Sequence, residues 1–469
     1  MPPTSERAPH PRSDAAALVA RRDTAVRAAV ARGLVTDREP LVALIDVTGV
    51  RTAARALHAA FAAATAPGTE VLHTFAVKAC PLVAVVRLLG DEGIGAEVAS
   101  PGELALARAA GTPAERTVLD SPAKTPAELR EAFALGIAVN ADNLQELARL
   151  DDLAVAYGPA GADRLPPLGL RVNPQVGAGT IDALSTATAT AKFGVALGDP
   201  GGRERVVRAF LDRPWLTRLH VHSGSQGVPA DLMVEGVART HALAEEVNAR
   251  AGRRQVDTVD LGGGLPVDFA SDDPDPGFAR YARLLAHRVP ALFDGRYRLV
   301  TEFGRALLAR PGLVLSRVEY TKSAGGRRIA VTHAGAQIAA RTVYAPEQWP
   351  LRVAGYDARG VPLATRPEVQ DVAGPACFAG DLIARGRTLP RLSPGDHVAV
   401  LDTGAYFFAH PYAYNALPRP AVYGFLAAAD GDPAAGTADG VSFATVRSAQ
   451  TIAEVVAEAG GEHPDGLLF

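Results

Sequence analysis

Short apolar runs alternate with helical stretches from about residue 50 to residue 315, and this alternation constrains the fold more than any other feature of the chain. Helical stretches such as Pro101–Ala110 and Thr125–Leu135 carry apolar residues at the i, i+3 and i+4 spacing of an amphipathic helix. Repeated strand–helix units form parallel sheets. The expected strands are Val71–Val77, Gly95–Ala99, Thr117–Asp120, Ile137–Asn140, Leu168–Val172, Leu219–His222, Val256–Leu261 and Arg298–Glu302.

Eight such units match a (β/α)8 TIM barrel in length, although their periodicity also fits a doubly wound sheet. We therefore expect an α/β protein in which residues 50–315 form the barrel. Beyond residue 315 the segments are short and interrupted by Gly and Pro, which predicts a mostly β C-terminal domain. We assign residues 15–49 and 316–469 to this domain, and we expect residues 1–14, rich in Pro, Ser and Arg, to be disordered.

Composition excludes several function classes. The net charge is -3, which gives no reason to propose nucleic acid or an anionic membrane as a partner. Only two cysteines occur, Cys80 and Cys377, so no disulfide framework is expected and a reducing cytoplasm suits the chain. The histidines show no HExxH spacing, and no apolar run is long enough to span a membrane, so neither a metal site nor a membrane location is expected.

Lys78 ends the strand-like run that begins at His73. An amine at the end of an apolar strand is poorly solvated, which lowers its pKa and makes it a nucleophile able to form a Schiff base with a carbonyl. A strand-end lysine that reaches solvent is the simpler alternative. If the carbonyl belongs to pyridoxal phosphate, the chain should also contain an anion-binding glycine loop and a carboxylate for the pyridine nitrogen.

Two segments at predicted strand ends fit that requirement. Gly262-Gly263-Gly264 follows Leu261, and consecutive glycines let backbone N–H groups approach a phosphate with no side chain in the way. Glu302 ends another predicted strand, where a barrel presents its active-site side chains, and a carboxylate there can keep a pyridine nitrogen protonated. A tight turn for the glycines and a salt bridge between Glu302 and Arg305 are the alternatives.

Further side chains suit binding or proton transfer. His220 and His222 face the same side of a predicted strand, where one of them can stack on an aromatic cofactor, and Ser225 can donate to a phosphate. Cys377 lies on a loop shaped by Gly and Pro and can donate a proton. The Tyr406 hydroxyl is a possible phosphate partner. For each of them a purely structural role, as a core histidine, a buried cysteine or a packed aromatic ring, is the alternative.

Taken together and in this order, the segments resemble the fold-type III PLP-dependent decarboxylases, the family of the diaminopimelate, ornithine and arginine decarboxylases. The resemblance runs from about residue 40 to residue 425 and is closest to the diaminopimelate decarboxylase-like proteins. The segments that carry it are Ala76–Ala79, Glu97–Leu104, Arg171–Pro174, Ser185 with Lys192–Gly194, His220–Ser225, Gly262–Gly264, Glu302–Arg305, Cys377–Asp381 and Gly404–Tyr406.

The resemblance implies an alanine racemase-like barrel with a C-terminal β domain, pyridoxal 5'-phosphate as cofactor and decarboxylation of an amino acid. It implies that Lys78 forms the Schiff base, His222 stacks on the ring and Glu302 pairs with the ring nitrogen. Cys377 would return a proton to the substrate after CO2 leaves, from a segment that reaches the active site of a neighbouring subunit, so a homodimer with shared active sites is implied. The other residues expected to bind the cofactor are Ser225, Gly262, Gly263, Gly264, Gly304, Arg305 and Tyr406.

The chain departs from the family where the substrate's far end is recognised. Members that act on basic or diamino substrates carry an acidic residue directly after the cysteine, whereas this chain has Phe378. The segment that contains His333 lacks the usual Asp, and Arg341 and Tyr344 lie near the position that binds a distal carboxylate in diaminopimelate enzymes. An ammonium buried without a counter-charge costs several kcal/mol. We therefore expect a substrate whose distal group is neutral, apolar or anionic, such as an amino-acid conjugate of a siderophore or antibiotic pathway.

Two other functions fit the same segments. A PLP-dependent racemase, or an enzyme of other Cα chemistry, would need a second base on the opposite face of the ring. A non-catalytic homologue of the decarboxylases would have lost cofactor-binding residues, whereas Lys78, Glu302 and the glycine triplet are all present.

Overall fold

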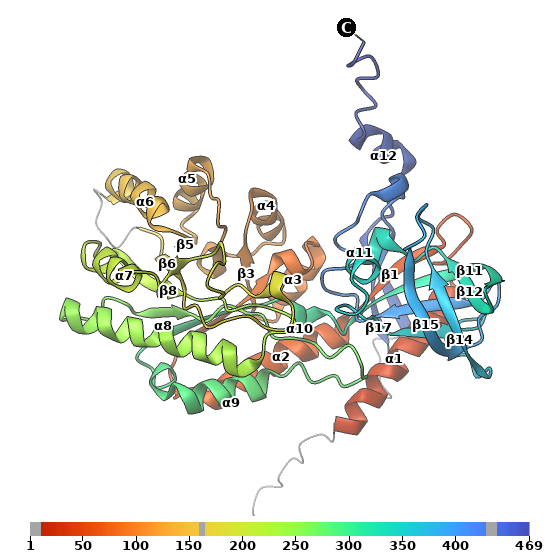
Figure 1. Ribbon diagram of the computed structural model, residues 1–469, viewed down its shortest axis with the longest axis horizontal. Helices are drawn as coiled ribbons and strands as arrows, with labels where there is room; N and C mark the ends of the chain where they lie inside the picture. Colours follow the sequence, from red (N-terminus) through yellow and green to blue (C-terminus); the bar gives the residue numbers. More distant parts are fainter. Residues whose placement is uncertain (1–10, 159–164, 428–438, 469) are drawn as a thin grey trace, which may run out of the picture. The chain divides into compact units, whose positions relative to one another are not determined.

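The computed structural model describes residues 11–158, 165–427 and 439–468. The chain divides into two compact units (Figure 1). The barrel unit comprises Arg51–Val267 and Pro276–Leu307, and the β unit comprises Met1–Val50, Asp268–Asp275 and Leu308–Phe469. No helix in the described part of the chain is long and apolar enough to cross a membrane.

The barrel unit is a closed barrel of eight parallel strands, as the alternating pattern predicts. Neighbouring strands pair in the order β2, β3, β4, β5, β6, β8, β9 and β10, and β10 pairs with β2 to close the ring. This closure excludes the doubly wound alternative. The strands are β2 (Val71–Ala76), β3 (Gly95–Val98), β4 (Thr117–Leu119), β5 (Ala138–Ala141), β6 (Leu168–Asn173), β8 (Leu216–His220), β9 (Thr258–Asp260) and β10 (Arg298–Phe303), with the short β7 (Val195–Ala196) beside β6.

Helices follow the strands and begin and end at recognisable signals. Thr125 and Glu128 form a capping box before α5, and Gly136 ends that helix with a positive φ of 73°. Ser100 accepts the N–H of Glu103 at the start of α4. The helices are α2 (Val47–Ala64), α3 (Val83–Asp91), α4 (Pro101–Ala109), α5 (Pro126–Leu135), α6 (Leu144–Tyr157), α7 (Gly202–Leu211), α8 (Ala230–Ala251), α9 (Phe278–Arg288) and α10 (Arg305–Leu308).

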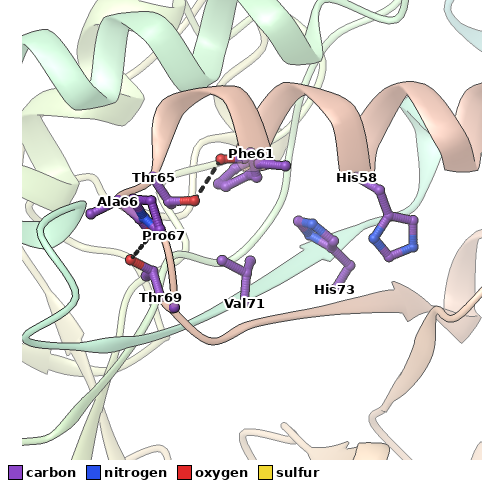
Figure 2. Close-up of a pocket in the computed structure, with 10 residues that line it drawn as sticks. His58, Phe61, Thr65, Ala66, Pro67, Thr69, Val71 and His73 are labelled. Carbon is purple, nitrogen blue, oxygen red and sulfur yellow. Dashed lines mark hydrogen bonds between the residues drawn. The ribbon is translucent and has the colours of Figure 1, made fainter.

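A pocket of about 390 Å³ lies between α2 and the start of β2, on the helix side of the barrel wall (Figure 2). His73 borders it and approaches Thr301 Oγ1 through Nδ1 at 2.8 Å. Burial, with a smaller effect of His58, lowers the pKa of His73 to about 3, so this histidine is neutral at physiological pH. The pocket opens where β2 begins, whereas active sites of such barrels lie where the strands end.

The β unit is built on one mixed sheet, which confirms a mostly β domain after residue 315. Its main path is β15-β14-β12-β11-β1-β17-β18, and β16 pairs with β11 and β13. Helix α1 (Pro11–Ala31) contributes Ala25, Val26 and Ala29 to its core. The strands are β1 (Leu41–Asp46), β11 (Gly312–Ala324), β12 (Arg327–Thr332), β13 (Val353–Tyr356), β14 (Pro367–Ala373), β15 (Leu382–Pro390), β16 (His397–Leu401), β17 (Ala421–Ala427) and β18 (Val441–Arg447), and the remaining helices are α11 (Ala336–Tyr344) and α12 (Ile452–Glu458).

The N-terminal segment differs from its prediction. Residues 11–14, expected to be disordered, form the first turn of α1, while residues 1–10 lie outside the described part of the chain. Proline at the first helical position has the backbone angle that a helix needs, and the alanine-rich sequence that follows favours helix over strand. Two boundaries also differ, because residues 308–315 and Asp268–Asp275, which were expected in the barrel, belong to the β unit.

Candidate active site

Lys78 lies just beyond β2, in the 3-10 turn Val77–Ala79. Its Nζ atom is 2.5 Å from Oε2 of Glu97, a buried residue of β3. The lysine side chain is 41% exposed, so the expectation of a desolvated amine is wrong. Because the 3-10 turn follows the strand directly, the Lys78 side chain leaves the apolar wall of the barrel and reaches the Glu97 carboxylate. Sequence reasoning missed Glu97 as its partner, although the parallel register pairs Ala76 with Glu97.

The glycine triplet follows β9 and makes close backbone contacts with the two neighbouring strand ends. A Cβ atom on Gly263 would lie 2.0 Å from the carbonyl oxygen of Glu302, and one on Gly264 would lie 1.8 Å from that of Gly224. The triplet therefore has a packing role of its own, which is to bring the ends of β8, β9 and β10 together. The N–H of Gly263 also donates to Nδ1 of His222 at 3.2 Å.

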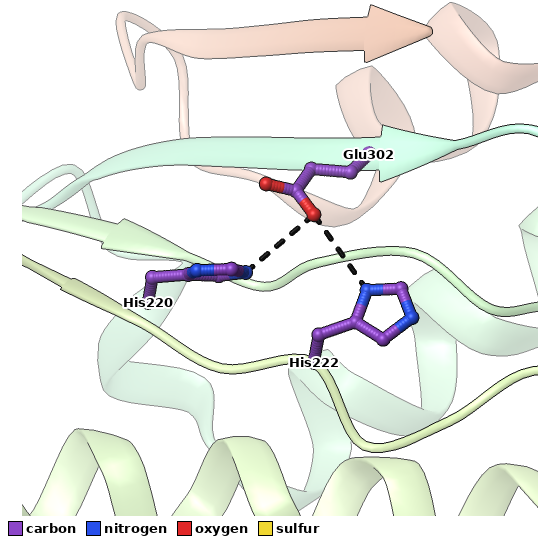
Figure 3. Close-up of side chains that lie close together, drawn as sticks. All are labelled: His220, His222 and Glu302. Atoms are coloured by element: carbon purple, nitrogen blue, oxygen red, sulfur yellow. Dashed lines mark ion pairs between the residues drawn. The ribbon is translucent and has the colours of Figure 1, made fainter. Parts of the chain in front are cut away.

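Glu302 is fully enclosed at the end of β10, and His220 and His222 point toward it (Figure 3). Its Oε2 atom lies 3.5 Å from Nε2 of His220 and 3.6 Å from Nδ1 of His222. His220 ends β8, whereas His222 lies beyond the strand, not within it as predicted. Because Nδ1 of His222 accepts the N–H of Gly263, it carries no proton, and His222 is a neutral ring. Burial and then the charge of Arg171 hold the pKa of His222 well below its usual range.

The remaining cofactor candidates of the barrel unit lie beside these residues in the chain. Ser225 is in the loop after β8, where its N–H donates to the carbonyl of Leu184 at 3.1 Å. Gly304 and the buried Arg305 follow β10 directly, and Arg305 begins α10. Since β8, β9 and β10 are adjacent, all the barrel residues predicted to bind phosphate follow three neighbouring strands at the same rim.

Cys377 is exposed on a loop of the β unit, which argues against the alternative of a buried, inert thiol. Its N–H donates to Oδ1 of Asn415 at 2.7 Å. The loop is fixed by Asp381, whose carboxylate accepts the N–H of Ala336 at 2.7 Å and the N–H of Ala376 at 2.6 Å. Asp381 itself is buried, so these two bonds are shielded from water.

Replacing Asp381 with alanine is expected to destabilise the β unit by about 2–4 kcal/mol, because two buried N–H donors lose their acceptor. The measurement is the free energy of unfolding in urea. Asp381→Asn is the matched control, since its single carbonyl oxygen can retain one of the two bonds and should lose less. Equal losses for the two variants would contradict this account.

Three tyrosine rings gather around Phe378, the residue after Cys377. Phe378 stacks on Tyr344 with a centroid distance of 5.5 Å and an interplanar angle of 6°, and Tyr414 meets its edge at 5.1 Å. Tyr412 completes the group through a 3.3 Å contact between its hydroxyl and that of Tyr344. We call Tyr344, Phe378, Tyr412 and Tyr414 the aromatic cluster. Tyr344 is 59% exposed, so the cluster presents ring surface to solvent or to a ligand.

Two further predicted substrate or cofactor residues of the β unit lie near one another. The guanidinium of Arg341 lies 4.8 Å from the ring centre of Tyr406 and 5.2 Å from that of Trp349. Its Nη1 atom is buried and has no hydrogen-bond partner among the described residues. His333 instead contacts Glu319 at 3.1 Å through Nε2. Arg341 can therefore accept an anionic group, while His333 is engaged with a carboxylate of its own domain.

The barrel unit offers the groups that pyridoxal phosphate requires. The Oε1 atom of Glu302 is a buried carboxylate oxygen without a hydrogen-bond partner among the described residues, as expected of an acceptor for a ring N–H. His222 presents a neutral ring beside it, and Lys78 presents an accessible amine held by Glu97. The residues present therefore fit the cofactor.

Comparisons with known proteins identify the family. The family described as "Pyridoxal-dependent decarboxylase, pyridoxal binding domain" matches residues 50–309. The diaminopimelate decarboxylase of Actinosynnema pretiosum subsp. auranticum is 34% identical over 389 residues, which cover 81% of this chain and 83% of that protein. That of Aquifex aeolicus is 30% identical over 354 residues, which cover 75% and 80%.

The fold is shared with solved structures. The diaminopimelate decarboxylase of M. jannaschii in complex with L-lysine aligns with a TM-score of 0.76 at 24% identity, covering 89% of this chain and 91% of that one. The likeness extends over both units, so the C-terminal β unit is part of the shared architecture. The chain belongs to the pyridoxal-dependent decarboxylases, and it is an amino-acid decarboxylase that uses pyridoxal 5'-phosphate.

Proposed function

We propose that this enzyme decarboxylates an amino acid, or an amino-acid conjugate, whose distal group is not a simple ammonium. The aromatic cluster at Phe378 supports the proposal, because stacked rings surround a position where family members that act on diamino substrates carry an acidic residue. A substrate of this kind fits secondary metabolism, such as the assembly of a siderophore or an antibiotic.

Each of the barrel residues has a separate role in this proposal. The bound cofactor supplies an electron sink for the bond to the departing carboxylate. Lys78 would hold the cofactor through its amine, and Glu97 lies beside Nζ, where it can keep a proton on that amine. Glu302 would bind the ring nitrogen, and His222 would pack on the ring as a neutral aromatic group. In the barrel unit, Ser225, the glycine triplet, Gly304 and Arg305 would bind the phosphate.

The aromatic cluster disfavours a bare ammonium on energetic grounds. Removing an ammonium from water costs several kcal/mol unless a counter-charge meets it. A cation–π contact returns only about 0.5–2 kcal/mol. Rings stack well on apolar or aromatic groups, and Arg341 with its unpartnered Nη1 atom suits a carboxylate or another anion. The cluster and Arg341 together favour a neutral, apolar or anionic distal end over lysine, ornithine or diaminopimelate.

We also propose that the enzyme is a homodimer with shared active sites. The support is the exposure of Cys377, whose loop is rigidly fixed by Asp381 yet leaves the thiol uncovered. A proton donor must lie close to the reacting carbon, since proton transfer requires hydrogen-bond reach. A thiol presented outward by one subunit can meet that requirement in the other.

The substrate proposal is tested by CO2 release from a panel of D- and L-amino acids and N- or side-chain-linked conjugates. We expect turnover of conjugates or of acids with apolar or anionic ends. The Phe378→Glu variant is expected to gain activity on diamino acids, because the new carboxylate meets the distal ammonium. Phe378→Leu is the matched control, since it removes the ring without adding charge. Efficient turnover of lysine, ornithine or diaminopimelate by the wild-type enzyme, with micromolar KM, would contradict the proposal.

A further inference from the structure

His220 is a buried histidine that the roles above leave unused. It ends β8 with its side chain turned toward Glu302 (Figure 3). Its Nδ1 atom lies 3.4 Å from Oδ1 of Asp120, and its Nε2 atom lies 3.5 Å from Oε2 of Glu302. Both ring nitrogens therefore face carboxylate oxygens, and all three residues are buried.

This geometry determines the protonation of the ring. A neutral imidazole carries one N–H and one lone pair, and the lone pair would then face a carboxylate in a site without water contact. An imidazolium presents an N–H to each carboxylate. His222 offers the opposite case on the same segment, because its Nδ1 atom accepts the N–H of Gly263. Two histidines that both lie beside Glu302 thus have different charges, and His220 is the one that carries the proton.

Other charged groups surround this pair from each adjoining strand. Asp260 of β9 lies within the same group of buried acids, where Arg218 of β8 approaches it at 3.8 Å and Asn140 of β5 donates to it at 3.2 Å. Lys124 acts on Asp120 from the loop after β4, and Arg171 of β6 acts on His222. The group therefore contains three acids, Asp120, Asp260 and Glu302, in a space where water cannot solvate them.

Such crowding favours protonated acids. Burial first, and then the charges of the neighbouring acids, raise the pKa of Asp260 and of Glu302, while the charge of His220 opposes the rise at both. At His220 itself, burial lowers the pKa, but Asp120 and Glu302 outweigh it and raise the pKa well above the usual range. The pKa of Glu302 is raised to about 7, and the imidazolium is the neighbouring charge that opposes this rise most.

We propose that His220 is a positioning residue: its imidazolium, fixed between Asp120 and Glu302, holds Glu302 as the carboxylate that binds the ring nitrogen of the cofactor. This inference rests on the proposed role of Glu302. Asp120 is the counterpart that keeps His220 charged and oriented. A carboxylic acid at Glu302 could not stabilise a protonated ring nitrogen, so the cofactor would bind more weakly and lose electron-withdrawing power.

The test is the affinity of the apoenzyme for pyridoxal phosphate as a function of pH. Affinity falls as pH drops through the protonation of Glu302. The His220→Gln variant removes the cation, so the midpoint of this fall should move up by about 1–3 pH units. The cofactor's own titrations are common to all variants and cancel in the comparison.

His73→Gln is the matched control. His73 is also a buried barrel histidine, but it is neutral and faces the helix side of β2, so its replacement should leave the midpoint unchanged. A second readout without cofactor is the infrared carboxylic-acid band of the apoenzyme. This band should persist to higher pH in His220→Gln, and the persistent component should vanish when Glu302→Gln is added.

The outcomes separate the two proposals. If His220→Gln weakens binding equally at every pH, with the midpoint and the infrared band unmoved, His220 only packs and the inference is overturned. If Glu302→Gln binds the cofactor as tightly as the wild type, the proposed role of Glu302 fails, and the inference fails with it. A loss of binding in Glu302→Gln with an unshifted midpoint in His220→Gln overturns the role of His220 alone.

Discussion

Replacing Lys78 with alanine is expected to abolish decarboxylation, with a fall in kcat of at least about 10³-fold. The variant loses the covalent link to the cofactor, and it also loses the proton that the amine carries beside Glu97. Loss of one positioned proton-transfer group alone costs about 10²- to 10⁴-fold, and loss of the nucleophile adds to it. The visible absorption band of the Schiff base should disappear in the same variant.

The lysine that binds the cofactor can be identified directly, because the chain contains only four lysines, at positions 78, 124, 192 and 322. Borohydride reduction of the holoenzyme, followed by peptide mapping, should place the cofactor on Lys78. Lys322→Ala is the matched control, since Lys322 is exposed on β11 and should leave both the band and the activity intact. A reduced cofactor attached to Lys124 or Lys192, or a Lys78→Ala enzyme that retains its absorption band, would exclude the proposed role.

The barrel could be predicted from sequence because its strands are buried on both faces. Runs such as Leu168–Val172 and Arg298–Glu302 are apolar enough to stand out between amphipathic helices, and each of the eight predicted runs overlaps a barrel strand. The order of pairing follows from the right-handed strand–helix–strand connection. Segment ends were harder to predict, since the expected strand at Leu219–His222 ends two residues earlier, at His220.

The polar interior of the barrel was less predictable, because it depends on register. Glu97, Asp120 and Asp260 come from three different strands or strand ends. Their roles become visible only when the fold shows which side chains lie opposite them. A buried carboxylate in a strand is one available signal, since acids are rarely buried without a partner. Lys78 shows the opposite error: a 3-10 turn of three residues was enough to expose a side chain expected in an apolar wall.

The aromatic cluster could not be read from sequence for a third reason. Tyr344 ends α11, Phe378 lies between β14 and β15, and Tyr412 precedes β17, so nothing local connects them. Phe378 was conspicuous only as a replacement for an acidic residue. The structure adds that Phe378 is stacked and supported by other rings, which makes it part of a built surface and not an isolated substitution.

Replacing Cys377 with alanine is expected to lower kcat by about 10²- to 10⁴-fold, the usual effect of removing a general acid. Cofactor binding should be unaffected, because all the proposed barrel contacts to the cofactor remain. The absorption band and the KM for substrate are therefore the internal controls. Cys80→Ala is the matched control, since Cys80 is the other thiol of the chain and is buried. An enzyme that keeps full activity without Cys377 would remove the thiol from the mechanism.

Mixing the two inactive variants turns this prediction into a test of the shared active site. In a twofold dimer each site would combine Lys78 of one subunit with Cys377 of the other. A heterodimer of Lys78→Ala and Cys377→Ala subunits then contains one site with both defects and one intact site. Random exchange makes half of the dimers mixed, so activity should return to about a quarter of the wild-type value. If Lys78 and Cys377 act within one subunit, no mixed dimer contains an intact site and the mixture stays inactive.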